Sequence, residues 1–207
     1  IKNIALSFVI TENLRSTGDS TFHFDYFWRR SVTAAVASEL VTGLLRQKND
    51  DIFVGGLLQD IGVLILHLAK GQEYGKALQH CLANGGTGLI HHENALFGYD
   101  HQLVGCLLLE HWGIPESITI PTRFHHCPEL APDNHQQTAL ILKIANLLSA
   151  ICNGSETTGL VLELQDRLAG SFGIASHQSR TLLDDVAKKS IDILKIFEID
   201  PGLIKPY

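Results

Sequence analysis

One segment, residues 52–69, is apolar almost all the way round a helix, which predicts a helix buried at the centre of the fold. It contains a single acid, Asp60, between Gln59 and Ile61. An unpaired carboxylate in an apolar interior is costly, so Asp60 must have a partner or line a cavity. Two interpretations stay open: a hydrogen bond that packs two helices together, or the acid of a metal or phosphate site.

The other strong patterns also follow the helical period and predict an all-α fold. Apolar residues at helical spacing predict helices over 27–47, 72–83, 100–112, 135–152, 158–172 and 177–197. A further helix is expected to start at Pro115 and to lead to a pair of histidines. No alternating strand pattern of useful length competes, although residues 4–10 fit a strand as well as a helix.

Composition allows a large buried core, since the 207 residues are 45% hydrophobic and 18% charged. The net charge of −6 argues against binding to nucleic acid, which needs a basic surface. The longest apolar run, residues 63–69, is broken by His67 and is too short to span a membrane. The four cysteines show no C-x-x-C spacing, which predicts reduced thiols in a cytoplasmic protein. A chain that starts without methionine is typical of a fragment.

Several histidines downstream of Asp60 have the chemistry of a hydrolytic metal site. His101 follows Asp100, which either caps a helix or orients the imidazole. His125 and His126 are adjacent at a predicted helix end, where one ring would point inward and the other outward. The alternative for this pair is a favourable interaction with the helix dipole.

Five short motifs occur in a fixed order along the chain. They are Phe27-Trp28-Arg29-Arg30-Ser31, the run from Gly55 to Gly62, Glu93 with the run from Phe97 to Gly105, the run from Leu107 to Pro115 followed by His125-His126-Cys127-Pro128, and the run from Ile144 to Leu148. In this order they resemble the motifs of the HDOD domain, among them F-W-x-H-S and G-L-L-H-D-I-G. The resemblance covers residues 27 to about 150.

This resemblance implies a helical bundle of the HD-superfamily type. HDOD domains are similar to metal-dependent HD phosphohydrolases, including the HD-GYP enzymes that cleave cyclic di-GMP, and are regarded as regulatory relatives found in bacterial signalling. The resemblance also divides the chain into three parts. Residues 1–26 would be the end of a preceding helical lobe with a connector, 27–152 the core, and 153–207 a C-terminal helical extension packed on the core.

The chain departs from the catalytic pattern of that superfamily at four positions. Arg30 replaces the first metal-binding histidine of that pattern, and Gln59 replaces the histidine of its His-Asp pair. Val63 replaces a lysine, and Asn146 replaces the last aspartate. The metal-binding residue types that remain are Asp60, His101, His125 and His126.

An arginine cannot ligate a metal ion and carries a permanent charge, so we expect Arg30 to form an ion pair with Asp60 where a metal would otherwise lie. Glutamine and asparagine are neutral, weak ligands for transition metals. We therefore expect a remnant site with no catalytic residue and no cofactor. The alternative is one divalent transition metal held by Asp60, His101 and the two paired histidines.

The leading functional interpretation is a regulatory signal-transduction domain whose surface binds another signalling protein or domain. The last two helices, 158–197, are the expected contact or homo-oligomerisation elements. The alternative is a metal-dependent phosphohydrolase that acts on a nucleotide or cyclic dinucleotide. A third interpretation is a sensor in which Arg30 and the histidines hold a phosphate or nucleotide without cleaving it.

Overall fold

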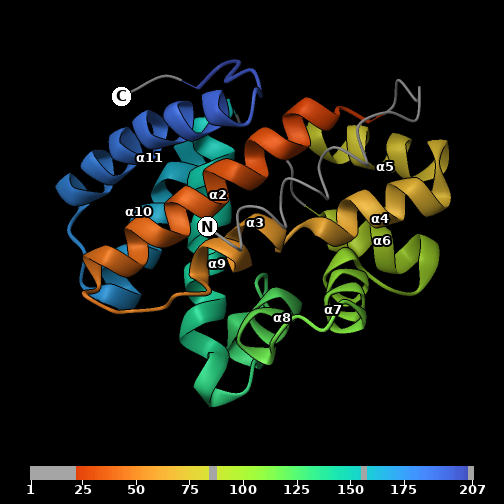
Figure 1. Ribbon diagram of the computed structural model, residues 1–207, viewed down its shortest axis with the longest axis horizontal. Coiled ribbons are helices and arrows are strands. Elements are labelled where there is room, and N and C mark those ends of the chain that lie inside the picture. The colour runs from red at the N-terminus through yellow and green to blue at the C-terminus, as the bar shows by residue number, and fades with distance from the viewer. Residues whose placement is uncertain (1–21, 84–87, 155–157, 205–207) are drawn as a thin grey trace.

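The protein is all-α, as the sequence predicts (Figure 1). In a computed structural model, the described residues are 22–83, 88–154 and 158–204, and these ranges contain helices and no strand. The helices are α2 (Phe24–Leu44), α3 (Ile52–Leu58), α4 (Ile61–Lys70), α5 (Gln72–Ala83), α6 (Leu89–Phe97), α7 (His101–His111), α8 (Glu116–Arg123), α9 (Asp133–Cys152), α10 (Thr158–Phe172) and α11 (Ser176–Ile196), with a 3-10 turn at Pro128–Leu130. The predicted ranges match α5 and α10 at both ends. Residues 4–10, and most of the predicted 1–26 part, lie outside the described residues.

Helix α2 packs between α9 and α3 at the centre of the molecule. On the α9 side, the Ser149 hydroxyl donates a hydrogen bond of 2.7 Å to the backbone oxygen of Arg30. On the α3 side, the backbones approach so closely that a Cβ on Gly56 would lie 2.9 Å from the Ala34 oxygen. A side chain in place of Gly56 would therefore push α3 away from α2.

The segment predicted as one helix over 52–69 is two helices, so that prediction is wrong. The chain leaves helical geometry at Asp60, with φ −101° and ψ 12°, and α4 restarts at Ile61. The cause is packing: α4 contacts α7 so tightly that a Cβ on Gly62 would lie 1.9 Å from the backbone oxygen of His101. An apolar pattern reports burial, but it does not report a change of direction forced by a neighbouring helix.

By length and composition the α3–α4 segment, Ile52–Lys70, could also cross a membrane. However, 72% of its most apolar window is buried inside the protein, as in a core helix.

The two C-terminal helices complete the core. Helix α10 packs on α9, and α11 packs on both α2 and α9. The side of α11 that faces the core buries Leu182, Leu183, Val186, Ala187 and Leu194. That apolar side is therefore used within the fold and is not available to a partner. Beyond α11, Nε of Arg29 donates a hydrogen bond of 2.7 Å to the backbone oxygen of Asp200, which ties the end of the described chain to α2.

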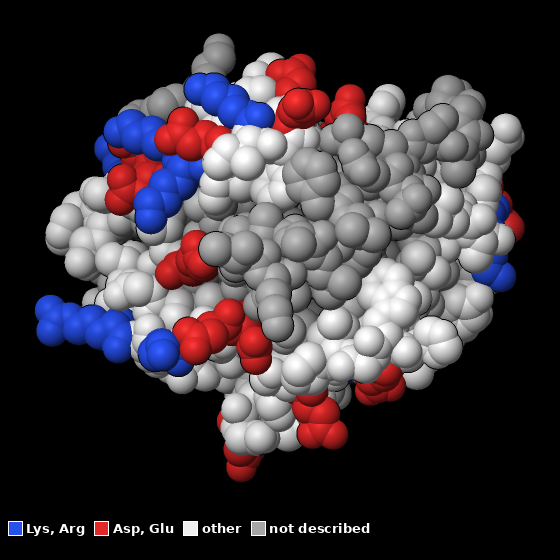
Figure 2. Space-filling model, viewed as in Figure 1, with Lys and Arg blue, Asp and Glu red and all other residues white. Residues whose placement is uncertain are grey.

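Figure 2 shows one face of the molecule with its charges. Lys and Arg side chains on this face lie beside Asp and Glu side chains, mostly towards α11, and they form no continuous positive surface there.

Candidate metal centre

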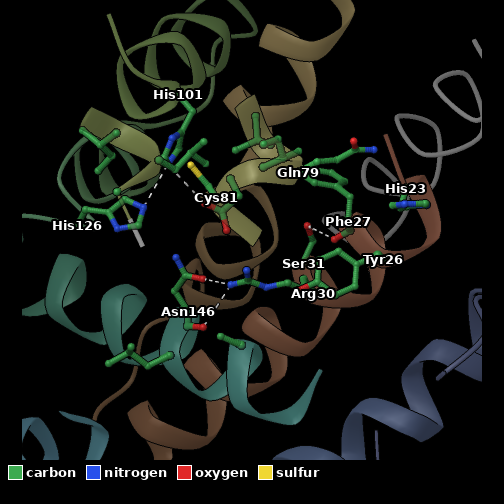
Figure 3. Close-up of a pocket in the computed structure, with 18 of the residues that line it drawn as sticks. His23, Tyr26, Phe27, Arg30, Ser31, Gln79, Cys81, His101, His126 and Asn146 are labelled. Atoms are coloured by element: carbon green, nitrogen blue, oxygen red, sulfur yellow. Dashed lines mark hydrogen bonds and ion pairs between the residues drawn. The ribbon is translucent and has the colours of Figure 1, made fainter. Parts of the chain in front are cut away.

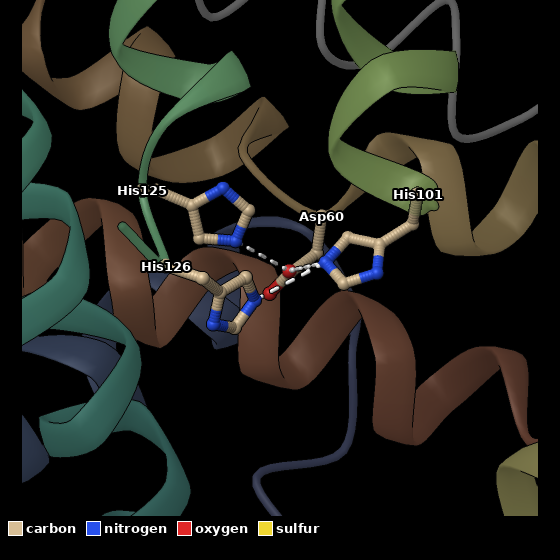
Figure 4. A group of neighbouring side chains, drawn as sticks. All are labelled: Asp60, His101, His125 and His126. Carbon is tan, nitrogen blue, oxygen red and sulfur yellow. Dashed lines mark hydrogen bonds and ion pairs between the residues drawn. The ribbon is translucent and has the colours of Figure 1, made fainter. Parts of the chain in front are cut away.

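Asp60, His101, His125 and His126 meet in one cluster (Figure 4). One ligand atom from each side chain lies within 4.8 Å of the other three. Nε2 of His125 is 3.3 Å from Oδ1 of Asp60, Nε2 of His101 is 3.7 Å from the same oxygen, and Nε2 of His101 is 3.1 Å from Nε2 of His126. The four residues that the sequence retains as possible ligands are thus brought together by the fold.

Three breaks between helices position the cluster. Asp60 lies in the turn between α3 and α4, and His101 is the first residue of α7. Asp100 caps α7, because its side chain accepts a hydrogen bond of 2.9 Å from the Leu103 amide. Helix α8 ends at Arg123, and the turn that follows carries His125.

Both rings of the histidine pair point into the cluster, so the prediction that one would point outward is wrong. Their centroids are 4.1 Å apart. The pair lies beyond the end of α8, where adjacent side chains need not diverge as they would on a strand or helix. The backbone of His126 is held from two sides: its amide donates to Gln102 at 3.0 Å, and its oxygen accepts from Lys143 at 2.7 Å.

Two hydrogen bonds behind the cluster fix which nitrogen each ring presents. Nδ1 of His125 is 2.7 Å from the backbone oxygen of Thr122, which can only accept, so Nδ1 carries the proton. Nδ1 of His101 is 2.7 Å from the carboxylate of Glu93. Each ring therefore turns Nε2, the nitrogen that can hold a lone pair, towards Asp60.

Glu93 is buried, and both oxygens of its carboxylate have hydrogen-bond partners. Besides the His101 ring, its carboxylate accepts the His101 amide at 3.0 Å and the Tyr74 hydroxyl at 2.5 Å. Burial, followed by the neighbouring charge of Glu93, raises the pKa of Tyr74 well above its ordinary value. Tyr74 is therefore a permanent donor that keeps Glu93 in place.

The protonation preferences inside the cluster differ from residue to residue. Burial opposes ionisation of Asp60, but the hydrogen bond and charge of His125, and then the charge of His101, hold the pKa of its carboxyl well below the ordinary range. Burial disfavours the charged form of His101, yet the hydrogen bond to Glu93 raises the pKa of its imidazole overall. Burial and the adjacent His125 and His101 lower the pKa of His126 well below its ordinary value. The site therefore favours a negative Asp60 and a neutral His126.

This donor set fits one divalent transition metal. Nitrogen and oxygen ligands at ordinary bond lengths of about 2.0–2.2 Å in a tetrahedral shell lie roughly 3.3–3.6 Å apart, close to the three separations given above. Nε2 of His125 is buried, and apart from its 3.3 Å contact with Oδ1 of Asp60 it has no partner among the described residues. A cation between the four atoms would satisfy that nitrogen.

The predicted ion pair between Arg30 and Asp60 is not formed in the described structure. The Arg30 guanidinium instead donates to the side-chain and backbone oxygens of Asn146 on α9, the latter at 3.4 Å (Figure 3). The Asn146 side chain is therefore the hydrogen-bond acceptor of Arg30, whereas the carboxylate of Asp60 faces His101 and His125. Arg30 and Asn146 thus bind each other beside the cluster.

Gln59 lies apart from the other predicted site residues. It is buried, but it does not line the cavity that Arg30, Asp60, His101, His126 and Asn146 share. Both polar atoms of its side chain lack a hydrogen-bond partner among the described residues.

Four residues that support the cluster are absent from the predicted site: Tyr74, Glu93, Gln102 and Lys143. Glu93 belongs to one of the five motifs, but no role in the site was assigned to it. Glu93 could have been found, because it lies four residues from both Leu89 and Phe97, on one side of α6. Tyr74, Gln102 and Lys143 each support the cluster through one hydrogen bond, which no pattern in the neighbouring sequence predicts.

Comparison with known proteins gives one family match and several solved structures with a similar fold. The family model described as HDOD domain matches residues 1–128. A candidate phosphohydrolase from Shewanella amazonensis has a similar structure (TM-score 0.72, 18% identity, 95% of this chain and 70% of that chain). An HDOD domain protein of unknown function from Geobacter sulfurreducens is also similar (TM-score 0.66, 19% identity, 93% of this chain and 67% of that chain). So is the MmoQ response regulator from Methylococcus capsulatus (TM-score 0.59, 24% identity, 79% of this chain and 62% of that chain). At these identities the likeness shows the fold. No curated protein matches the sequence.

Proposed function

Because this chain belongs to the HDOD domain family, we propose that it is a signal-transduction domain that acts by binding and not by hydrolysis. The family match covers more than half of the chain, and one protein of similar structure is a response regulator. On this proposal the domain acts in the cytoplasm, and its output partner is another signalling protein or domain.

The proposed binding centre is one divalent transition metal ion held by Asp60, His101, His125 and His126. The observation that carries it is the convergence of a carboxylate oxygen and three Nε2 atoms within 4.8 Å, with Glu93 and the Thr122 oxygen orienting two of the rings. Imidazole and carboxylate ligands suit Zn, Fe, Ni or Mn. When bound, the ion would supply a fixed positive charge that locks three helix ends together.

The same geometry argues against a phosphohydrolase. Catalytic sites with one metal ion keep a position open for water, whereas four protein ligands fill the shell of a tetrahedral ion such as Zn²⁺. A second ion beside the first would need further anionic ligands, and there the chain has Arg30 bound to Asn146. A permanent cation repels a second metal ion.

Elemental analysis of the purified protein tests the metal centre, alongside titration of the stripped protein with Co²⁺ followed by visible absorption. We expect about one metal ion per chain. We also expect His125→Gln and Asp60→Asn to lose the ion, whereas His111→Gln, at the exposed end of α7, keeps it.

A wild-type protein that takes up neither its native metal nor Co²⁺ would contradict the metal centre. Steady hydrolysis of bis(p-nitrophenyl) phosphate, abolished by His125→Gln and retained by His111→Gln, would contradict the binding role and restore the enzyme interpretation.

A further inference from the structure

A cavity of about 370 Å³ opens beside the metal-binding cluster. Its polar lining residues include Arg30 on α2, Lys143 and Asn146 on α9, and His126. Figure 3 shows Arg30 directed towards Asn146. The remaining wall is mostly apolar, with Phe27, Val63, Leu78 and Leu147 among its residues. A largely apolar wall with a few convergent polar groups is the usual form of a small-molecule site.

The two cations of this cavity lack neutralising partners in the described part of the chain. Arg30 donates to the neutral Asn146, and its Nε is buried with no partner there. The recorded hydrogen bond of Lys143 goes to the backbone oxygen of His126. Neither residue has a carboxylate within ion-pair distance in the described ranges.

The acids that line the cavity are already engaged elsewhere. Asp60 faces His101 and His125, and Glu163 pairs with Arg167 at 2.8 Å. In a chain with a net charge of −6, two cations without an ion pair in the lining of one cavity are a local exception, and the charge of Arg30 also acts on Asp60 in that lining.

We propose that this cavity binds a small molecule with an oxyanion head, a phosphate or carboxylate, and an apolar body the size of an aromatic ring. Arg30 and Lys143 hold the head, because guanidinium and ammonium groups form strong charge-assisted hydrogen bonds to oxyanions. The apolar wall covers the body. This inference rests on the proposed binding role of the domain, but it does not require the metal ion.

The experiment uses isothermal titration of the purified full chain with four probes: phenyl phosphate, benzoate, inorganic phosphate and phenol. Phenyl phosphate and benzoate carry a head and a body, and the other two carry one part each. We expect a head and body together to bind at least about tenfold more tightly than either part alone. Comparing phenyl phosphate with benzoate identifies the head.

Four variants assign the site. Arg30→Gln and Lys143→Gln should each weaken binding of the better probe by about tenfold. Lys195→Gln removes the same charge from an exposed position on α11 and should leave binding unchanged. His125→Gln, whose side chain does not line the cavity, should lose metal yet still bind the probe, which separates this inference from the metal centre.

Equal binding by wild type, Arg30→Gln and Lys143→Gln would overturn the proposal, as would a failure of phenyl phosphate and benzoate to bind at millimolar concentration. If Arg30→Gln fails to fold, as judged by circular dichroism, Lys143→Gln alone decides.

Discussion

The carboxylate of Glu93 lies 2.7 Å from Nδ1 of His101, and both side chains are almost fully buried. The bond joins the first residue of α7 to the middle of α6. A carboxylate behind a histidine fixes the ring and makes its other nitrogen a better ligand.

Replacing Glu93 with Gln should therefore weaken metal binding by about tenfold to a hundredfold, because the amide keeps the shape but loses the charge behind His101. Competition with a chromophoric chelator measures the affinity. Glu116→Gln, at the exposed start of α8, is the matched control. Unchanged affinity in Glu93→Gln would mean that His101 does not ligate the ion.

The depressed pKa of His126 predicts a pH effect in metal-free protein. Below about pH 6.5 the unfolded chain protonates this histidine while the folded protein does not, so its contribution to stability is lost as the pH falls. His126→Gln lacks this loss. In urea unfolding with chelator present, the free energy of unfolding of the variant should therefore rise relative to that of wild type as the pH falls from 7.5 to 5. The change should be at most about 1.4 kcal/mol per pH unit.

His111→Gln controls for the loss of one exposed histidine in the same measurement. A difference between wild type and His126→Gln that stays constant, or that moves in favour of wild type in acid, would show that His126 accepts a proton readily in the fold.

Gly62 sets the distance between α4 and α7. Gly62→Ala should lower the free energy of unfolding by about 1–3 kcal/mol and reduce metal binding, because the new methyl group meets backbone atoms that cannot move aside. Gly170→Ala, on the open side of α10 with no atom within 4 Å, should instead stabilise by about 0.5–1 kcal/mol. Denaturant unfolding compares the two, and equal effects would refute the close contact.

Gln59 is a buried amide with both polar atoms unpaired in the described structure. Gln59→Met keeps the length and removes the unpaired groups, so it should raise the free energy of unfolding by about 1 kcal/mol. Gln137→Met, at an exposed position on α9, should change stability little. A clear loss of stability in Gln59→Met would reveal a partner for the amide.

The fold class and most helix ranges could be predicted because each helix buries one side. Apolar spacing over 72–83 and 158–172 therefore matches α5 and α10. Residue chemistry made Asp60, His101, His125 and His126 candidates, since few residue types hold a transition metal, and the resemblance to the HDOD motifs selected them as a set.

What could not be predicted depends on contacts between distant helices. The partner of Arg30 is decided by α9, which supplies Asn146 116 positions away in the chain. The position of the α3–α4 break depends on α7, and the direction of the His126 ring on Gln102 and Lys143. Periodicity within one helix contains none of this information.

The turn of Gln59 and Asp60 has a consequence for how this segment can change in length. Each residue of a helix advances its neighbours by about 100° around the axis. Deleting one residue at the junction would rotate α4 by that angle, so that a residue with a side chain, in place of Gly62, would face the backbone oxygen of His101. We conclude that the contact between α4 and α7 fixes the length of this junction, so that an insertion or a deletion there would disrupt the packing.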